Sequence, residues 1–347
     1  WLDNVVPQGD VATITINTGH KVIVDHNLKI TDDYKIAVNN GVLQITQQGQ
    51  LINDSDVNVP GIVEIVTPQK SMNRWTFIGA PFENNYKLGT IYPMSHDISV
   101  SKYDYSTANW SESWAHVGTP MEAGEGYFAW PFYDGAVIFT TYGDVWNYEE
   151  GKVGEYNFDR QPKTETYLNN TDVVITKENL QGNANTGRWM ALANPYPAKL
   201  SVSEFVADNN IQGGGIYRLT SNTSNGVTTY TFVDLVGEIA MTEGFFVNLP
   251  SGNQVTFSKE QLTNYPTSAK SQVAPREFIE LSLVKGNHNS KLYFAHNQEA
   301  EQNYDIFDAN KLFALGEVAE PYFVTDGIAL VKEEVAELID FLKNPKK

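Results

Sequence analysis

The sequence has no cysteine among its 347 residues. Disulfides, thiol nucleophiles and thiolate metal sites are therefore excluded together. Histidine is also scarce, and the histidines do not show the spacing typical of metal ligands; they stand at positions 20, 26, 96, 116, 288 and 296. We expect no organic cofactor, and a chain without cysteine is compatible with export through an oxidising compartment.

Basic residues are few: 24 Lys and Arg stand against 42 Asp and Glu, which gives a formal net charge of −18. A nucleic-acid-binding surface needs clustered lysine and arginine to displace counterions from phosphate, so we expect no nucleic-acid partner. The same charge disfavours binding to an anionic membrane surface. No apolar run approaches the roughly 20 residues of a spanning helix, so we expect no membrane span. The first residues lack a signal-peptide pattern, and we expect either a cytoplasmic protein or a mature exported one.

Common catalytic signatures are missing as well. The sequence contains no Gly-x-Ser-x-Gly, no phosphate-binding loop and no His-Glu-x-x-His. Carboxylates are abundant, so a pair at the spacing suited to glycoside cleavage arises by chance and is not evidence for that activity. We therefore expect that the protein is not an enzyme.

The composition that is present favours β-structure. A hydrophobic fraction of 41% and an aromatic fraction of 12% are too high for a disordered chain. Asn, Thr, Gly and Val are plentiful, whereas Ala and Leu are not prominent, and this balance is typical of strands and turns. The length predicts two to four domains with buried cores.

An internal duplication is the most informative feature. Residues 74–81 (RWTFIGAP) return as residues 188–195 (RWMALANP), and residues 125–129 (EGYFA) return as residues 243–247 (EGFFV). Between these blocks, Lys102-Tyr103 matches Ile216-Tyr217 at the offset of the first block. Residues shared by both copies are best explained by a shared architecture. Differences between the copies are then the place to look for function.

The duplication divides the chain into four parts. Residues 1–66 form an N-terminal segment, residues 67–155 are copy one, residues 156–268 are copy two, and residues 269–347 are a C-terminal region. The sequence predicts an all-β fold, in which a β-helix-like segment precedes two related sandwich or jelly-roll-like modules and a small Ig-like sandwich.

Short strands and polar turns alternate in the N-terminal segment. The predicted strands are alternating or β-branched stretches that recur about every 6 to 9 residues, as in the rungs of a β-solenoid. They cover residues 13–16, 21–24, 28–30, 35–38 and 42–45.

In the two copies, shared aromatic residues predict buried sheet faces. Trp75, Phe77 and Trp189 alternate with their neighbours as core side chains of a sheet do. Gly126 and Gly244 each precede two aromatic residues, which indicates a bulge or a close approach of backbones. Core packing is favoured over a ligand platform for these shared residues.

The C-terminal region begins after a linker-like stretch at residues 266–275. Residues 278–284 and 292–295 predict a hairpin, and residues 304–312 and 321–324 continue the sheet. Apolar residues at helical spacing within residues 332–342 predict a short amphipathic helix packed on this domain, with a partner-binding helix as the alternative. The residues at that spacing are Val335, Leu338, Ile339 and Leu342.

Several of these motifs together resemble modular extracellular proteins of Bacteroidetes that are exported by the type IX secretion system. Residues 188–197 (RWMALANPYP) are similar to the W-x-x-x-G-N-P-Y-P strand of that family, and residues 242–247 (TEGFFV) to its G-x-G-F-F-V strand. Residues 304–312 (YDIFDANKL) resemble its Y-D-x-x-D-A-x-K-L strand. Copy one departs from the pattern at residues 79–82 (GAPF), and the Lys-rich C-terminus does not resemble a sorting domain. The resemblance implies a β-helical start, a C-terminal sandwich, and an extracellular or outer-cell-surface location.

Aromatic residues found in only one copy are the candidate ligand-binding residues. Trp110 and Trp114 lie in a polar stretch whose counterpart in copy two has no aromatic residue, and Trp130 and Tyr133 stand where copy two has Asn248 and Ser251. Loop indoles stack on sugar faces, so these residues predict carbohydrate binding. The alternative is that they cover copy one itself or its contact with residues 1–66.

A structural Ca²⁺ site is a further candidate. Asp305 and Asp308 are hard oxygen donors close in sequence, although solvated turn acids are the favoured interpretation because a complete site needs six or more oxygens. Asp32-Asp33 and Asp54-Ser55-Asp56 are equally eligible.

Three functions therefore remain open at this stage. The first is a secreted or cell-surface, non-enzymatic structural or adhesion protein with a glycan or protein partner. The second is a carbohydrate-binding module that captures glycans through Trp110 and Trp114. The third is a polysaccharide hydrolase or lyase that uses two carboxylates. The sequence carries no signal for an oligomeric state.

Overall fold

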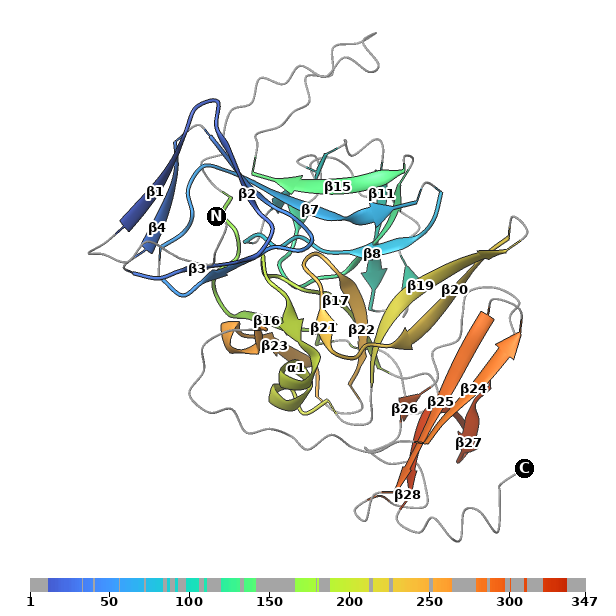
Figure 1. The fold of residues 1–347 in the computed structure, drawn as a ribbon. Coiled ribbons are helices and arrows are strands. Elements are labelled where there is room, and N and C mark those ends of the chain that lie inside the picture. The colour runs from blue at the N-terminus through green and yellow to red at the C-terminus, as the bar shows by residue number, and fades with distance from the viewer. Residues whose placement is uncertain are drawn as a thin grey trace.

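The computed structural model places most of the chain in β-strands. The residues that it describes are 12–32, 34–39, 41–55, 57–71, 73–83, 86–87, 91–92, 98–105, 109–110, 120–131, 134–141, 166–178, 180, 188–211, 215–224, 227–249, 252–263, 279–285, 288–296, 300, 309–310 and 321–335. The expected all-β class is confirmed. In Figure 1 the N-terminal strands lie at the upper left, the two copies in the centre and the C-terminal sheet at the lower right.

The N-terminal strands form a parallel coil. They are β1 (Ala12–Asn17), β2 (Lys21–Val24), β3 (Asn27–Ile30), β4 (Tyr34–Asn39), β5 (Val42–Ile45), β6 (Gln50–Asn53) and β7 (Ile62–Lys70). Parallel pairing joins β1 to β4, β3 to β6, and β2 to β5 to β7. Asn27 lies opposite Gln50 and Val42 opposite Ile62, so partners are 20 to 23 residues apart. The predicted strands are present. Each of the first three strands pairs with the third strand after it, so one turn of the coil contains three strands. The predicted spacing of 6 to 9 residues therefore separates neighbouring strands and not successive turns.

Strand β7 joins the coil to copy one. It pairs in parallel with β5 and antiparallel with β15 (Gly135–Thr140), which also pairs with β10 (Ile91–Tyr92). Because β7 serves both regions, they share one hydrophobic cluster that includes Leu43, Ile65, Val100 and Tyr127.

The two copies have the same strand order. In copy one a four-stranded sheet runs β12-β11-β14-β8, and in copy two the equivalent sheet runs β20-β19-β22-β17. The bounds for copy one are β8 (Thr76–Ile78), β11 (Ile98–Asp104), β12 (Asn109–Trp110) and β14 (Tyr127–Pro131), and those for copy two are β17 (Trp189–Ala193), β19 (Ile216–Ser224), β20 (Val227–Asp234) and β22 (Gly244–Asn248). Each copy also has an equivalent short pair, β9 (Tyr86–Lys87) with β13 (Pro120–Met121), and β18 (Leu200–Ser201) with β21 (Glu238–Ile239). A second layer covers copy two, where β16 (Val173–Thr176) pairs with β23 (Gln254–Phe257) as β7 pairs with β15.

The register refines the sequence alignment of the copies. Phe128 lies opposite Phe77, and Phe246 lies opposite Ala191, as the repeated motifs require. On their other side, β14 and β22 pair with β11 and β19, and there the register differs: Phe128 pairs with Ser101, whereas Phe246 pairs with Tyr217. The equivalent of Tyr217 is therefore Ser101, so the expected match of Tyr217 with Tyr103 is wrong by two residues. A shift of two keeps every side chain on the same face of the sheet, which is why the sequence pattern tolerated it.

The two aromatic residues of the repeated motif pack on opposite faces of the sheet. The first, Tyr127 or Phe245, lies in the core of its own copy. The second, Phe128 or Phe246, joins a cluster between the copies. This inter-copy cluster consists of Phe77, Tyr103, Phe128, Trp189, Ala191, Tyr217, Phe246 and Leu292. Because successive side chains of a strand point to opposite faces, one aromatic residue of the motif stabilises its own copy and the next stabilises the contact between the copies.

The two motif glycines lie where backbones approach closely, as predicted. A Cβ atom on Gly126 would be 2.5 Å from the carbonyl oxygen of Leu192, and one on Gly244 would be 2.6 Å from the ring of Phe77. Both contacts cross from one copy to the other. A side chain at either position would separate the copies.

The described strands of the C-terminal region form one sheet. Its strands are β24 (Ile279–Lys285), β25 (His288–His296), β26 (Ala309–Asn310), β27 (Phe323–Thr325) and β28 (Ile328–Val335). The predicted hairpin is confirmed as the antiparallel pair β24–β25. A second layer, which the expected sandwich requires, is not found among the described residues. The predicted linker at residues 266–275 lies outside them.

The helix predicted at residues 332–342 is wrong over its first turn. Residues 332–335 continue β28, which pairs with β25, β26 and β27, and residues 336–342 lie outside the described part. Pairing within the sheet outweighs the local apolar spacing, because Ile328 and Leu330 alternate into the sheet's buried side. The described residues instead contain one α-helix that was not expected, α1 (Val202–Asp208), beside a single 3₁₀ turn at Lys259–Gln261.

No helix in the described residues is long and apolar enough to cross a membrane.

Candidate functional site

The predicted aromatic site is only partly within the described structure. Trp110 lies in β12, opposite Tyr103 of β11. Trp130 lies in β14, is half-buried, and has its ring centroid 5.0 Å from that of Trp75 in an edge-on arrangement. Trp114 and Tyr133 lie outside the described residues. Trp130 therefore packs against a shared core residue, and the grouping of all four aromatic residues stays a prediction.

The predicted calcium donors Asp305 and Asp308 also lie outside the described residues. Among the residues that the structure describes, no group of three or more His, Asp or Glu side chains is arranged to hold a metal ion.

A different site appears where the two copies meet. Ile78 of copy one bridges to Glu243 of copy two, and the equivalent Leu192 of copy two bridges to Glu125 of copy one. The hydrogen bonds follow the same exchange: Gly79 N donates to Thr242 O at 3.1 Å, and Ala193 N donates to Gly124 O at 2.8 Å. The copies are thus related by an approximate two-fold axis. Each glutamate of the repeated motif lies beside the other copy.

A lysine follows the same symmetry. Lys70 ends β7 opposite Gly135, and Lys177 follows β16 and donates its backbone N–H to Asn253. Lys70 is thus the last residue, and Lys177 the next residue after the end, of the strand that pairs with the last strand of its copy. The fold therefore makes two equivalent sites, one with Lys177 and Glu125 and the other with Lys70 and Glu243.

The first of these sites is closed. Lys177 forms a direct ion pair with the buried Glu125 and lies 4.7 Å from the centre of the Tyr105 ring. The Tyr105 hydroxyl donates to Ala191 O at 3.1 Å and accepts from Ala191 N at 3.2 Å. Burial raises the pKa of Tyr105 well above its usual value, and the nearby Glu125 adds to the shift. The tyrosine ring fills the space above the ion pair.

The second site pairs its glutamate differently. Arg218 Nε lies 2.9 Å from Glu243 Oε1, and Ala240 N donates to Glu243 Oε2 at 2.8 Å. Burial raises the pKa of Glu243, although Arg218 and the Ala240 hydrogen bond oppose the shift. Burial lowers the pKa of Lys70, and the charge of Glu243 partly offsets this effect.

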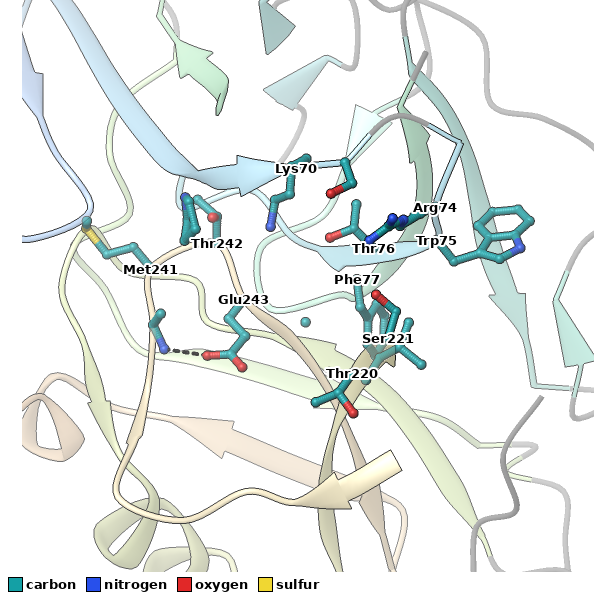
Figure 2. A pocket seen from close by; sticks show the side chains of 15 residues that line it. Lys70, Arg74, Trp75, Thr76, Phe77, Thr220, Ser221, Met241, Thr242 and Glu243 are labelled. Atoms are coloured by element: carbon teal, nitrogen blue, oxygen red, sulfur yellow. Dashed lines mark hydrogen bonds between the residues drawn. The ribbon is translucent and has the colours of Figure 1, made fainter. Parts of the chain in front are cut away.

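This second site is an open pocket of about 320 Å³. Its lining includes Lys70, Arg74, Thr76, Phe77, Thr220, Ser221 and Glu243. Figure 2 shows Lys70 extending from β7 toward the segment that carries Thr242 and Glu243, whereas the indole of Trp75 points away. We call this space the inter-copy pocket.

One substitution between the copies explains why one site is open and the other closed. Because Ser101 is equivalent to Tyr217, Tyr105 is equivalent to Ser221. Tyr105 fills the closed site, and the small, exposed Ser221 leaves a pocket at the equivalent place among the residues that the structure describes. The open pocket is thus a property of copy two's sequence and not a requirement of the shared fold.

The backbone of the pocket is strained at Thr242. This buried residue has φ 61°, in the left-handed region that β-branched residues avoid, whereas its equivalent is Gly124 with φ 80°. Such a conformation costs about 1–3 kcal/mol and concentrates at functional sites. Thr242 lines the inter-copy pocket.

The pocket carries an excess of positive charge. Lys70 and Arg74 have no carboxylate within 4.0 Å in the part of the chain that the structure describes. Glu243 is the one carboxylate among the described lining residues, and Arg218 already binds it. Two cations therefore face the space in a chain whose net charge is −18.

The sequence pattern did not predict these residues. The expected match of Tyr103 with Tyr217 places Tyr105 against Leu219, and at that offset the exchange of Tyr105 for Ser221 is not visible. The repeated Glu-Gly motif did contain a signal for these sites. The same glutamate precedes a buried strand in each copy, and a carboxylate next to a buried strand requires a charged or hydrogen-bonding partner.

Comparison with known proteins supplies a family but no activity. A family model matches residues 3–318. The chain belongs to the family described as DUF8693, a domain of unknown function. No curated protein and no solved structure matches the chain. The match covers the coil, both copies and the first strands of the C-terminal sheet, so the inter-copy pocket lies within the family's own boundaries.

Proposed function

We propose that this protein is a non-enzymatic adhesion or recognition protein that holds a small polar ligand in the inter-copy pocket. The observation that carries this proposal is the difference between the two equivalent sites. Tyr105, Lys177 and Glu125 close one site, whereas Ser221 opens the other, where Lys70 has no direct ion pair with any residue that the structure describes. The closed site shows that the shared fold can form without a pocket at this position, so the open pocket is not a requirement of folding.

The charges in the pocket favour binding over hydrolysis. Cleavage of a glycosidic bond by the usual mechanism needs two carboxylates that flank the bond. The described lining offers Glu243 alone, so a second carboxylate to complete such a pair is not found among the lining residues that the structure describes. Pre-positioned cations and hydroxyl groups are typical of a site that orients a ligand.

Placement outside the cell is a second part of the proposal. It rests on the resemblance of residues 188–197 and 242–247 to exported modular proteins, and on the absence of cysteine. Brief treatment of intact producing cells with a protease should degrade this protein while a cytoplasmic marker survives. Protection of the protein until the cells are lysed would contradict this placement.

The test of binding uses Ser221→Tyr, which copies the closed site into the open one. The wild type and the variant are applied to a panel of sugars, glycans and small organic acids, and binding is measured by calorimetry. We expect at least one ligand of the wild type to be lost in Ser221→Tyr and kept in Trp110→Ala with Trp114→Ala. A ligand that depends on the two tryptophans instead would favour the loop site.

Turnover distinguishes the enzymatic alternative. The bound ligand should be recovered unchanged after prolonged incubation with the purified protein. A panel with no ligand, or conversion of the ligand to product, would contradict the proposal.

A further inference from the structure

We infer that the inter-copy pocket takes a single sugar ring that bears a carboxylate. This inference rests on the proposed binding function and adds the chemical class of the ligand. The charge, the hydroxyl groups and the size of the pocket each restrict the ligand.

The two cations select an anion. Lys70 and Arg74 line the same space, and neither has a carboxylate within 4.0 Å among the described residues. A half-buried cation without a partner is costly, and an incoming carboxylate supplies the missing charge. Arginine matches a carboxylate with two parallel hydrogen bonds, whereas lysine acts as a point charge.

The hydroxyl groups select a polyol. Thr76, Thr220 and Ser221 line the pocket beside the cations. Thr220 Oγ1 lies 2.8 Å from Thr231 Oγ1, which fixes its position, and Ser221 is exposed. A hydroxyl can both donate and accept, as the hydroxyl groups of a sugar do. Phe77 adds an apolar surface for the C–H face of a ring.

The size limits the ligand to one ring. A volume of about 320 Å³ lies at the lower end of the range of roughly 300–1,000 Å³ for small-molecule pockets. An extended oligosaccharide would have to leave the pocket past the exposed Ser221. A terminal acidic sugar of a glycan and the free monosaccharide therefore present the same chemistry to this site.

Glu243 favours a carboxylate over a phosphate. Its carboxylate lies in the same lining, where Arg218 and the Ala240 N–H hold it in place. A phosphate monoester brings nearly two negative charges beside it, and a carboxylate brings one. Where the anionic group of the ligand lies beside Glu243, the repulsion from this carboxylate is therefore greater for a phosphate than for a carboxylate.

The experiment measures the affinity for glucuronate, glucose and glucose 6-phosphate by calorimetry with the full chain. We expect glucuronate to bind about tenfold or more tightly than glucose, because a charged hydrogen-bonded pair is lost with glucose. Glucose 6-phosphate should bind more weakly than glucuronate. A glucuronate-terminated oligosaccharide should bind as the monosaccharide does if only the terminal ring enters.

The variants assign the effect to residues. Lys70→Met and Arg74→Gln should each weaken glucuronate binding about tenfold or more and leave glucose binding unchanged. Ser221→Tyr should abolish both. Lys102→Gln removes an exposed lysine on β11, outside the pocket lining, and should change neither. The thermal midpoint of each variant checks that it is folded.

The pH dependence follows from the groups that face the ligand. Lys70 must be charged to bind an anion, and burial lowers its pKa below 10.5 in the free protein. Glu243, whose pKa is raised, becomes neutral on acidification and then repels the anion less; the other charged groups beside the ligand are Arg74 and Arg218. Affinity for glucuronate should therefore fall as the pH rises from neutral toward 10, and affinity for glucose should stay constant.

The outcomes separate the inference from the proposed function. Equal binding of glucose and glucuronate, both lost in Ser221→Tyr, would contradict the preference for a carboxylate but support the inter-copy pocket as the binding site. Tighter binding of glucose 6-phosphate would likewise overturn the carboxylate. If none of the three probes binds but another ligand does so in a Ser221-dependent way, the sugar acid is wrong and the binding function stands. Binding of none of the panel by the wild type would overturn both.

Discussion

Lys70 and Lys177 occupy equivalent places in the fold but have different surroundings. Lys177 contacts Glu125, and both side chains are largely buried, with 20% and 6% of their surface exposed. Lys70 has no ion pair of this kind within the described part of the chain, and burial lowers its pKa. The first lysine contributes to stability, and the second is held in a position that is unfavourable for a charge in the free protein.

Substituting the two lysines should therefore give different stabilities. Lys177→Met leaves Glu125 charged and buried without a partner and should lower the free energy of unfolding by about 3–5 kcal/mol. Lys70→Met should change it by about 0.5 kcal/mol or less, or raise it. Denaturant unfolding at pH 7 provides the measurement. As a control, Lys177→Met combined with Glu125→Gln should recover most of the loss; equal losses for both lysines would contradict the assignment.

The stability difference at Lys70 should depend on pH in a defined direction. Its folded-state pKa lies below the unfolded value of 10.5, so the folded protein binds the proton less tightly than the unfolded chain does. The penalty from Lys70 is fully present below the lowered pKa and disappears as the pH rises toward 10.5. Any advantage of Lys70→Met at neutral pH should therefore vanish near pH 10.5.

At the scale of strands and helices, local patterns predicted most of the elements. The five short strands of residues 12–45 follow from period-2 alternation and nearby turn residues, which need no knowledge of tertiary partners. The hairpin β24–β25 follows in the same way. The signal for α1 was present too, because Ser201 caps the helix by accepting from Glu204 N at 3.4 Å, in a Ser-x-x-Glu pattern.

The elements that sequence missed depend on partners distant in the chain. Residues 332–335 have helix-compatible spacing, but their strand is fixed by β25, some 40 residues earlier. The coil's repeat of 20 to 23 residues depends on which strands pair in parallel with one another. The distance between consecutive strands along the sequence does not determine it. The inter-copy pocket depends on a register that makes Ser221 the counterpart of Tyr105. Because a shift of two residues leaves the hydrophobic pattern unchanged, sequence could not fix that register.

Strand β22 should be the element that couples the copies. Phe246 lies in the inter-copy cluster, with ring centroids 5.0 Å from Phe77 and 5.4 Å from Phe232. Phe246→Ala should lower the free energy of unfolding by about 3–5 kcal/mol, because a buried ring is replaced by a cavity. Near-ultraviolet circular dichroism should lose intensity, since Trp189 and Tyr217 pack against the same ring or its neighbours.

Phe232→Ala is the matched control for this change. Phe232 is half-buried and touches the same cluster from the rim, so its loss should be smaller. A larger loss for Phe232 than for Phe246 would show that the cluster is not the contact that holds the copies together.

At the scale of the molecule, the hydrophobic clusters do not follow the sequence divisions. One cluster contains coil residues such as Leu43 and Ile65 together with Val100 and Tyr127 of copy one. The inter-copy cluster then joins copy one to copy two and reaches Leu292 of the C-terminal sheet. The net charge of −18 opposes compactness through self-repulsion, so these shared clusters must hold the parts together.

The coil and copy one should therefore unfold as one cooperative unit. Leu43 is fully buried at the centre of the coil, and Leu43→Ala should cost about 2–5 kcal/mol. Native-state hydrogen exchange should then accelerate in β14 of copy one as well as in β5 and β7, because all three contribute to the same cluster. Ile23→Ala, at a position with 54% of its surface exposed on the neighbouring strand β2, should leave these rates nearly unchanged. If Leu43→Ala accelerates exchange in the coil alone, the coil and copy one are separate units, and the pocket wall that β7 provides would then be held by copy one without help from the coil.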